Sequence, residues 1–345
     1  MQSMEVTAIS SIEHILAWIG LVLVISQIKK VLLRVLSAKD GGTIVGQEFT
    51  HPDTSGHPLA TSSVFQQPSL EISVVIPVQP GTGKLRLQGL LNEAVDSLKL
   101  NVSNQLWEIV LVGPPGEELT VVGKSFLQML GYEHIRLLIL PSHSLDASGF
   151  AGILRRGVLV SRGKFILTCD TSGSVRFSDF VELERTRAAF SAERGGLVVG
   201  SRWQKNRNWY SGVVSKLVGA PHLPDPTCPY RWFTNEAAAL LFSAMESRRS
   251  DGTDEILILS RYAEIPVLSC PIRWTPISEA VDLLAAIRCA VGALSTRLLY
   301  SSGYYAVSFP TRGGKVGDAF ENVERNALYR SNAREIGLHR FHSTS

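Results

Sequence analysis

The sequence predicts an α/β protein whose core is a single, mostly parallel, Rossmann-like sheet. Short runs rich in Val, Ile and Leu recur along the chain, and amphipathic stretches separate them: EISVVIPV (71–78), WEIVLVG (107–113), IRLLILP (135–141) and KFILTCD (164–170). Strands that alternate with helices form right-handed crossover units, which pair in parallel. The 345 residues, of which 45% are hydrophobic and 19% charged, are enough to bury the core of one large domain or two small ones.

The composition argues against a nucleic-acid partner and against a zinc or disulfide framework. The formal net charge is only +3, and the sequence contains no block of Lys and Arg interleaved with aromatic residues. We therefore expect no nucleic-acid partner, whereas an anionic small molecule or a membrane surface is compatible with this charge. The four cysteines form no Cys-x-x-Cys pair, so we expect reduced, buried thiols rather than a zinc site or a disulfide framework.

Residues 1–36 are predicted to anchor the chain in a membrane. The uncharged apolar run from Ile15 to Ile28 is shorter than the roughly 20 residues that span hydrocarbon, but a helix extended back to Val6 supplies the missing length. Basic residues follow the run and none precedes it, so the positive-inside bias places the rest of the chain in the cytoplasm. A cleaved signal peptide and an amphipathic helix on the membrane surface are the alternatives.

A stretch rich in Gly, Ser, Thr and Pro, residues 37–69, is predicted to be a flexible linker to the main domain, residues 70–278. Beyond the four runs given above, GGLVVGSRW (195–203) predicts a further strand. A Pro-rich loop then leads into a helix, for which Thr234 is the expected N-cap and Glu236 lies in the first turn.

The C-terminal part has two predicted segments. Residues 279–309 form a mildly amphipathic helical segment, which either packs on the domain or lies at a membrane surface. Residues 310–345 form a polar tail rich in Arg and Asn. In an open parallel sheet, ligands bind beyond the carboxyl ends of the strands, so we expect the functional residues directly after each predicted strand.

Six segments stand in the order found in family 2 glycosyltransferases: SVVIPV, WEIVLVG, GILRRGVLVSRGKFILTCDTSG, VVGSRW, DPTCPYRWFTNEAA and EIPVLSCPIRWTPI. The resemblance covers roughly residues 72–299, and the chain is most similar to the dolichyl-phosphate β-glucosyltransferases. It implies a GT-A type fold, a UDP-sugar donor, a dolichyl phosphate acceptor and a Mg²⁺ or Mn²⁺ cofactor. It also implies a single-pass protein of the endoplasmic reticulum membrane, in the pathway that builds N-glycan precursors, with its domain in the cytoplasm.

The sequence departs from the family pattern where the nucleoside binds. After the first strand the family has an aromatic residue, Asn and Glu, whereas this chain has Gln79, Pro80 and Gly81. The second strand of the family ends in two acids that hold the uracil and the ribose, and here it ends in Gly113 and Pro114. Both sets of nucleoside contacts are therefore expected to be missing.

Asp170 is the candidate metal ligand. It follows the strand KFILT, where sugar-nucleotide enzymes often place an Asp-x-Asp pair, but the second acid is replaced by Ser172. Mg²⁺ and Mn²⁺ prefer hard oxygen ligands and usually take one or two carboxylates from the protein, so the site lacks one full negative charge. The alternative is that Asp170 is a turn residue whose carboxylate is satisfied by backbone amides of the turn at Ser172 and Gly173.

The resemblance also assigns roles around the departing diphosphate. Contacts with the sugar nucleotide are implied for Pro77, Arg155, Asp170 and Asp225, and catalytic roles for Asp254, Arg202 and Arg231. Asp254 matches an acid often taken as the base, although a phosphate acceptor is already an anionic nucleophile. The two arginines would stabilise the charge of the leaving diphosphate, and ion pairing or solvation is the alternative for each.

Three functions follow as hypotheses. The first is an inverting transferase that moves glucose from UDP-glucose to dolichyl phosphate on the cytosolic face of the endoplasmic reticulum. The second is a catalytically inactive relative that acts as a membrane-bound partner or regulator, which the losses favour because they fall after separate strands that converge on one cleft. The third is a transferase with a different donor or acceptor. Fold similarity alone does not choose among them.

Overall fold

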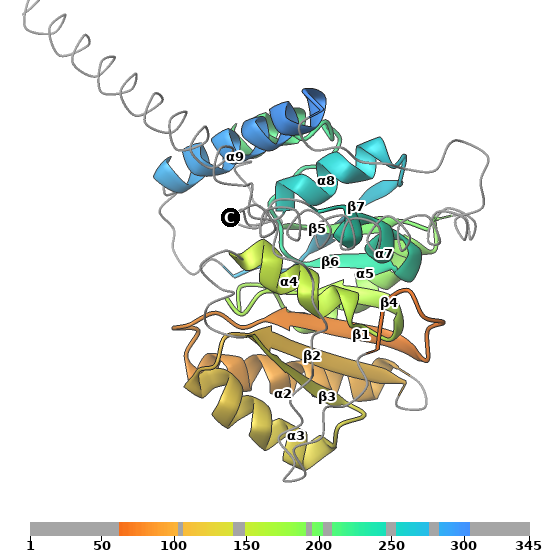
Figure 1. Ribbon diagram of the computed structural model, residues 1–345, viewed down its shortest axis with the longest axis vertical. Coiled ribbons are helices and arrows are strands. Elements are labelled where there is room, and N and C mark those ends of the chain that lie inside the picture. The colour runs from red at the N-terminus through yellow and green to blue at the C-terminus, as the bar shows by residue number, and fades with distance from the viewer. Residues whose placement is uncertain are drawn as a thin grey trace, which may run out of the picture. The chain divides into compact units, whose positions relative to one another are not determined.

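The computed structural model describes residues 62–102, 106–140, 149–190, 195–202, 209–245, 253–275 and 283–303. Within them the strands form a single sheet in the order β3-β2-β1-β4-β6-β5-β7 (Figure 1). The strands are β1 (Leu70–Pro77), β2 (Trp107–Gly113), β3 (Ile135–Ile139), β4 (Gly163–Thr168), β5 (Leu197–Arg202), β6 (Arg231–Thr234) and β7 (Val267–Ile272). Only β6 runs antiparallel to its neighbours β4 and β5, so the predicted mostly parallel α/β sheet is confirmed.

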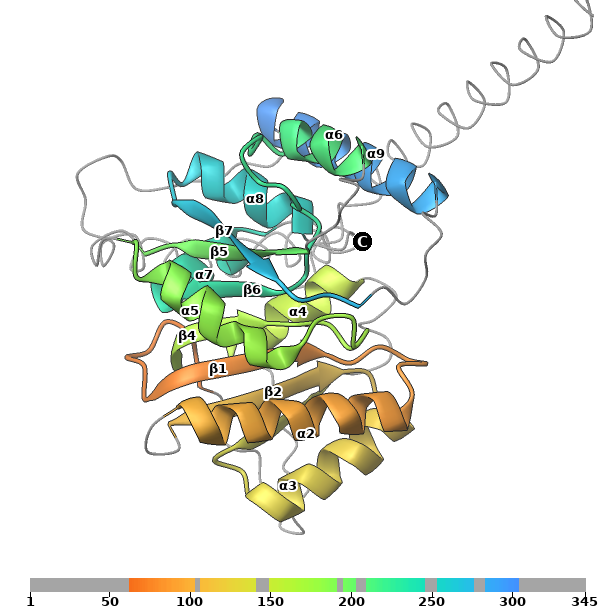
Figure 2. The same ribbon diagram turned by 180° about the vertical axis from the view of Figure 1, so that it is seen from behind.

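Helices cover both faces of the sheet, which explains why the central strands are apolar without alternation. On one face lie α4 (Phe150–Leu159) and α7 (Asn235–Ala244), as Figure 1 shows. On the other lie α2 (Lys84–Asn101) and α5 (Phe180–Arg187), as Figure 2 shows. The remaining helical segments are the π-helical η2 (Glu118–Gly123), α3 (Lys124–Leu130), the short 3₁₀ turn η4 (Phe177–Asp179), α6 (Trp209–Leu217), α8 (Thr253–Tyr262) and α9 (Leu283–Ser301).

Strand direction gathers the site loops at one edge of the sheet. The carboxyl ends of β1, β2, β4 and β5 meet there, and antiparallel β6 begins there, with Arg231 opposite Thr168 of β4. The loops that follow β1, β2 and β4, and the Pro-rich loop that precedes β6, are therefore neighbours. This is the edge at which the sequence predicted the functional residues.

The opposite edge is held by a buried charged network. Glu108 of β2 is fully buried, and its carboxylate accepts hydrogen bonds from the hydroxyl of Ser73 at 2.6 Å and from Nη1 of Arg136 at 3.1 Å. The backbone N–H and Nε of Arg162 also donate to it, at 2.8 and 2.9 Å. This carboxylate joins β1, β2, β3 and the start of β4.

Several local features expected from the sequence can be compared with the structure. Thr234 is the N-cap of α7, because its hydroxyl accepts the backbone N–H of Ala237 at 3.3 Å, as predicted. Residues 62–69, the end of the predicted linker, contact the domain: Val64 is fully buried and its N–H donates to the Leu159 carbonyl at 2.8 Å. All four cysteines are free thiols; Cys169, Cys228 and Cys270 are buried as expected, whereas Cys289 is half-buried. Burial raises the pKa of Cys228 to about 12.

The three predicted segments outside the main domain and the linker have different outcomes. The helical segment at 279–309 contains α9, which packs against α6 and α8, and the hydroxyl of Tyr300 donates to the buried carboxylate of Glu255 at 2.7 Å. The predicted membrane anchor and the polar tail lie outside the described residues. Among the helices that are described, none combines the length and apolar character needed to cross a membrane.

Candidate functional site

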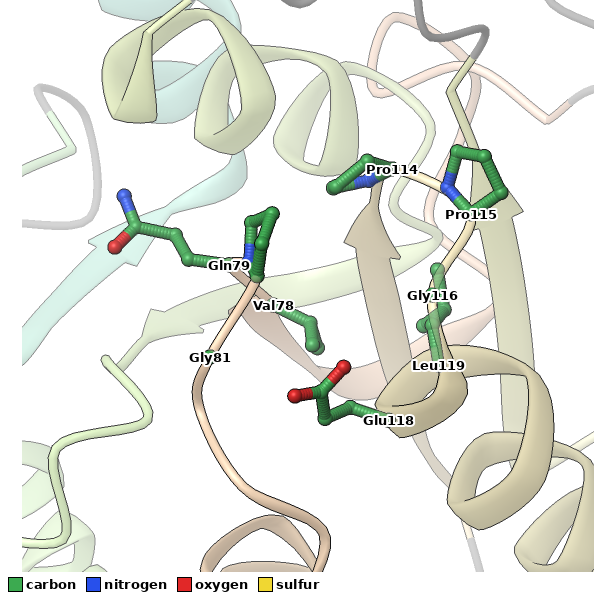
Figure 3. A pocket seen from close by; sticks show the side chains of 9 residues that line it. Val78, Gln79, Gly81, Pro114, Pro115, Gly116, Glu118 and Leu119 are labelled. Atoms are coloured by element: carbon green, nitrogen blue, oxygen red, sulfur yellow. The ribbon is translucent and has the colours of Figure 1, made fainter.

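A small pocket lies between the loops that follow β1 and β2 (Figure 3). Its volume is about 80 Å³, well below the roughly 300 Å³ or more of typical small-molecule sites. The lining residues are Val78, Gln79, Pro80, Gly81, Pro114, Pro115, Gly116, Glu118 and Leu119. Figure 3 shows the carboxylate of Glu118 pointing into the space between the two loops. The place where a nucleoside was expected is therefore a shallow, proline-lined hollow.

A close backbone approach explains why this pocket is small. The N–H of Val78 donates to the Val112 carbonyl at 2.8 Å, so the chain beyond β1 continues over the end of β2. A Cβ atom at Gly113 would lie 2.2 Å from the carbonyl oxygen of Val78, which is shorter than any ordinary contact. Only glycine fits this position, and no side chain from it can reach a ligand.

Glu117 and Glu118, the two acids that follow the Pro-Pro turn, contact the loop after β1. Nζ of Lys84 lies 2.7 Å from Oε2 of Glu117, and this pair lowers the pKa of the Glu117 carboxyl. The N–H of Gly83 donates to Oε1 of Glu118 at 3.3 Å. Both carboxylates thus lie at the N-terminus of α2, where the helix dipole favours negative charge. The loops after β1 and β2 are tied to each other.

The turn that contains Asp170 is satisfied by side chains. The hydroxyl of Ser172 donates to Oδ1 of Asp170 at 2.8 Å, and the N–H of Ser174 donates to that hydroxyl at 3.2 Å. The sequence suggested backbone amides as the partners of Asp170, whereas its partner in the structure is the residue that replaces the second acid. The hydroxyls of Thr82 and Thr171 lie 3.1 Å apart and join this turn to the first loop.

The donor set around Asp170 has the right chemistry for Mg²⁺ or Mn²⁺ but too little charge. One carboxylate and the hydroxyls of Ser172 and Ser174 are hard oxygen ligands, and the two hydroxyls lie 2.7 Å apart. Across the described residues, no three His, Cys, Asp or Glu side chains come together in a way that could hold a metal ion. Asp170 would be the protein's carboxylate ligand if a cation bound with a diphosphate.

We expect Ser172→Asp to raise Mn²⁺ affinity by about tenfold or more, because it places a second carboxylate within contact of Asp170. Asp170→Ala should lower affinity by a smaller factor, since the native site starts with only one carboxylate. Titration of each full-length variant with Mn²⁺, followed by electron paramagnetic resonance of the free ion, measures both changes. Tight Mn²⁺ binding by the native protein that is lost in Asp170→Ala would contradict this expectation.

Arg202 and Asp225, two predicted site residues, bind each other. The guanidinium of Arg202 donates to both carboxylate oxygens of Asp225, Nε to Oδ2 at 2.5 Å and Nη2 to Oδ1 at 2.8 Å. Thr227, which the sequence analysis did not single out, accepts from Nη2 of Arg202 at 2.7 Å and donates to Asp225 at 3.0 Å. This planar, bidentate pair fastens the Pro-rich loop to the end of β5. The Asp-x-Thr spacing at 225–227 was the available signal for it.

Arg231 is buried at the start of β6, with 2% of its surface exposed. Its Nε donates to the Cys228 carbonyl at 3.0 Å and its Nη2 to the Pro226 carbonyl at 2.8 Å, so it also organises the Pro-rich loop. Burial lowers the pKa of this guanidinium to about 10, while the charges of Cys228, Asp254 and Asp225 act in the opposite direction. Arg231 nevertheless stays a cation at neutral pH.

Asp254 lies in the first turn of α8 and faces α9. Its Oδ1 accepts the N–H of Glu255 at 2.9 Å, and its Oδ2 accepts the hydroxyl of Thr296 at 3.3 Å. The charge of Asp254 raises the pKa of Arg231, against the larger effect of burial. Arg202, Asp225, Arg231 and Asp170 lie at the ends of neighbouring strands or on the loops that join them, at one edge of the sheet.

Arg155 and Pro77 lie in different surroundings. Nε of Arg155 donates to the Phe242 carbonyl at 2.6 Å and its Nη2 to the Ser243 carbonyl at 3.0 Å. These are carbonyls of the last turn of α7, where a cation complements the helix dipole. Pro77 is the buried last residue of β1. The nucleotide contact expected for each of them remains a prediction.

Two solved structures have a limited similarity to this chain. Glucosyl-3-phosphoglycerate synthase from Mycobacterium tuberculosis, in a crystal structure with Mn²⁺, UDP and phosphoglyceric acid, is 13% identical with a TM-score of 0.47, over 68% of this chain and 79% of that one. Mannosyl-3-phosphoglycerate synthase from Rubrobacter xylanophilus is 12% identical with a TM-score of 0.45, over 71% and 78%.

The relatives found by sequence share a single name and are more similar to this chain than the solved structures are. Dolichyl-phosphate β-glucosyltransferase from Drosophila melanogaster is 26% identical over 62% of this chain and 70% of the relative. The proteins of the same name from Dictyostelium discoideum and Mus musculus are each 25% identical, over 69% and 73% of this chain and 77% and 82% of the relatives. No protein-family model matches the chain. The predicted resemblance to the dolichyl-phosphate β-glucosyltransferases is thus confirmed as a sequence similarity.

Proposed function

We propose that this chain is a catalytically inactive relative of the dolichyl-phosphate β-glucosyltransferases, which acts as a membrane-bound partner or regulator. The observation that carries the proposal is the contact at Gly113, where a Cβ atom would lie 2.2 Å from the Val78 carbonyl oxygen. At this position the resemblance implies an acid that binds the nucleoside. The backbone of the first loop occupies the space that such a side chain would need.

Two further features support the proposal. The loops after β1 and β2 are joined by Lys84 with Glu117 and by Gly83 with Glu118, and the pocket between these loops has a volume of only about 80 Å³. The guanidinium of Arg202 forms a bidentate ion pair with Asp225. The carboxylate of Asp225 therefore offsets the positive charge that would otherwise attract a diphosphate. Compared with the family pattern, the chain therefore has fewer contacts for a nucleoside and less free positive charge to stabilise a diphosphate.

An active glucosyltransferase is the second candidate, favoured by the names of the sequence relatives and by Asp170, which lies two residues beyond Thr168, the strand partner of Arg231. In that reaction a phosphate oxygen of dolichyl phosphate would attack the anomeric carbon of UDP-glucose, and the bond from that carbon to UDP would break with inversion. Arg231 and Arg202 would stabilise the leaving UDP, and Asp170 would hold Mg²⁺ or Mn²⁺, which neutralises the diphosphate when bound. On both proposals the domain faces the cytoplasm from the endoplasmic reticulum membrane, because basic residues follow the N-terminal apolar run.

We expect UDP-glucose to bind no more tightly than the millimolar range, with or without Mn²⁺. Each missing nucleoside contact costs on the order of 1–3 kcal/mol, and two absent contacts weaken binding by a factor of roughly 30 or more. Calorimetry on the full chain measures the affinity, and transfer of labelled glucose to dolichyl phosphate measures turnover, with a dolichyl-phosphate β-glucosyltransferase as the positive control. Saturation at micromolar UDP-glucose, or recovery of lipid-linked glucose in cells that lack the enzyme, would establish the second candidate instead.

A further inference from the structure

Helix α9 carries two apolar faces of different character. The inward face packs against α6 and α8 through small or polar residues, and its buried members are Ala286, Ala293, Thr296 and Tyr300. The bulkier aliphatic residues lie elsewhere: Ile287, Val291, Leu294 and Leu298 follow one another at helical spacing and form a single stripe. Successive helical residues turn by about 100°, so this stripe lies roughly opposite the inward face.

The stripe is open along its C-terminal half. Leu294 is 44% exposed and Leu298 is 57% exposed, while Ile287 and Val291 are half-buried. A helix of a water-soluble protein normally turns its large aliphatic residues inward and its small polar residues outward. In α9 two large aliphatic residues, Leu294 and Leu298, face outward instead. Hydrophobic surface of this kind, arranged as one stripe, indicates an interaction.

Helix α6, which packs against α9, also carries an exposed aliphatic residue. It lies beside α9 at the outer edge of the domain (Figures 1 and 2), and its Val213 is 40% exposed. Nη1 of Arg297 donates to the carbonyls of Lys216 and Leu217, at 3.2 Å each, and joins the C-terminal end of α6 to α9. We call the surface formed by Val213, Lys216, Leu294, Arg297 and Leu298 the α6–α9 surface.

The charge of this surface selects among possible occupants. The stretches 209–217 and 283–301 contain Lys216, Arg288 and Arg297 and not one Asp or Glu. Lys216 and Arg297 are both exposed. Exposed aliphatic side chains flanked only by cations are typical of helices that lie in the interface of an anionic bilayer, whereas lysine is depleted from the core of protein interfaces.

We propose that the α6–α9 surface docks on an anionic lipid bilayer, with Leu294 and Leu298 at the level of the acyl-chain boundary and Lys216 and Arg297 among the headgroups. The proposal does not depend on sugar transfer, because none of these residues belongs to the candidate site. It defines the orientation of the domain on a membrane: α9 and α6 face the lipid, and α2 and α3, at the other end of the sheet, face away from it.

The test compares two exposed leucines in the full chain, Leu298 on the α6–α9 surface and Leu100 on α2. Leu298→Cys and Leu100→Cys, the latter at an 84% exposed position of α2, are each labelled with bimane in a Cys289→Ser background, because Cys289 is the half-buried thiol and the other three are buried. The chains are mixed with vesicles of phosphatidylcholine and phosphatidylserine that carry brominated acyl chains. We expect roughly threefold or greater quenching at position 298 relative to position 100, since an interfacial helix sinks about 5–10 Å.

Two further arms separate this docking from tethering through the N-terminal segment and from self-association. Any such tether holds both labels near the same vesicle, so it cannot by itself produce the difference between them. Vesicles of phosphatidylcholine alone, and Lys216→Glu on the anionic vesicles, should each reduce the quenching at position 298. Equal quenching at both positions would overturn the proposal. A second result would also overturn it: lipid fails to quench the label at position 298, and the unlabelled Leu298→Cys chain forms disulfide-linked dimers. A second copy of the chain would then cover the surface.

Discussion

Replacing Glu108 by Gln is expected to lower the free energy of unfolding by about 3–5 kcal/mol, because the change removes the buried carboxylate that pairs with Arg136 and Arg162. The Glu108 carboxylate is 0% exposed and accepts from Ser73, from Arg136 and twice from Arg162. Arg136 is itself 1% exposed, so it has no access to bulk water. A neutral amide keeps the shape but presents only one oxygen to these donors.

Urea unfolding of the full chain, followed by the fluorescence of buried Trp107 and Trp232, measures the difference. The matched control is Glu117→Gln, which removes a carboxylate from an ion pair whose side chains are 51% and 74% exposed. That pair is worth under about 1 kcal/mol, so the control should shift the midpoint little. Equal losses in the two variants would show that the network at the amino-terminal edge does not stabilise the sheet.

The sequence predicted the parallel core because its signals are local. Runs such as WEIVLVG are apolar on both faces except for one acid, which marks strands covered on both faces, and β1 to β4 occur where such runs occur. The sequence does not predict strand β6, because the Pro-rich stretch that contains Arg231–Thr234 indicates a loop that leads into a helix. Four residues carry little periodicity, and their strand conformation depends on pairing with Phe165 and Leu197, which are distant in sequence. Non-local pairing of this kind leaves no mark on the segment itself.

The candidate site was predictable in position but not in its contacts. Asp170, Arg202 and Asp225 meet at one edge because strand direction dictates it, and strand direction follows from the alternation of strands and helices. The bidentate pair of Arg202 with Asp225, and the use of Arg155 by the last turn of α7, depend on distances set by the whole fold. The acid in WEIVLVG was a visible sign of the buried network around Glu108, since an isolated carboxylate in an apolar strand requires partners.

Gly113→Ala should lower the free energy of unfolding by about 3 kcal/mol. This variant tests the close backbone contact on which the proposal of a catalytically inactive protein rests. The added Cβ would lie 2.2 Å from the Val78 carbonyl oxygen and 3.2 Å from its carbonyl carbon, and backbone atoms cannot rotate away as the end of a side chain can. To relieve this contact, the first loop must separate from the end of β2 and break the bond from the Val78 N–H to the Val112 carbonyl. Urea unfolding again gives the measurement.

Gly89→Ala is the matched control, because Gly89 lies inside α2 and a Cβ there meets nothing within 4 Å. Alanine in the interior of a helix is favoured over glycine by about 0.5–1 kcal/mol, so this variant should gain stability while Gly113→Ala loses it. Opposite signs from the same chemical change would show that the first loop is pressed against β2 in solution. If Gly113→Ala were instead as stable as the native chain, the first loop could withdraw at little cost. An acid at position 113 would then be sterically acceptable, and the closed loop would no longer argue against a nucleotide pocket at this edge of the sheet.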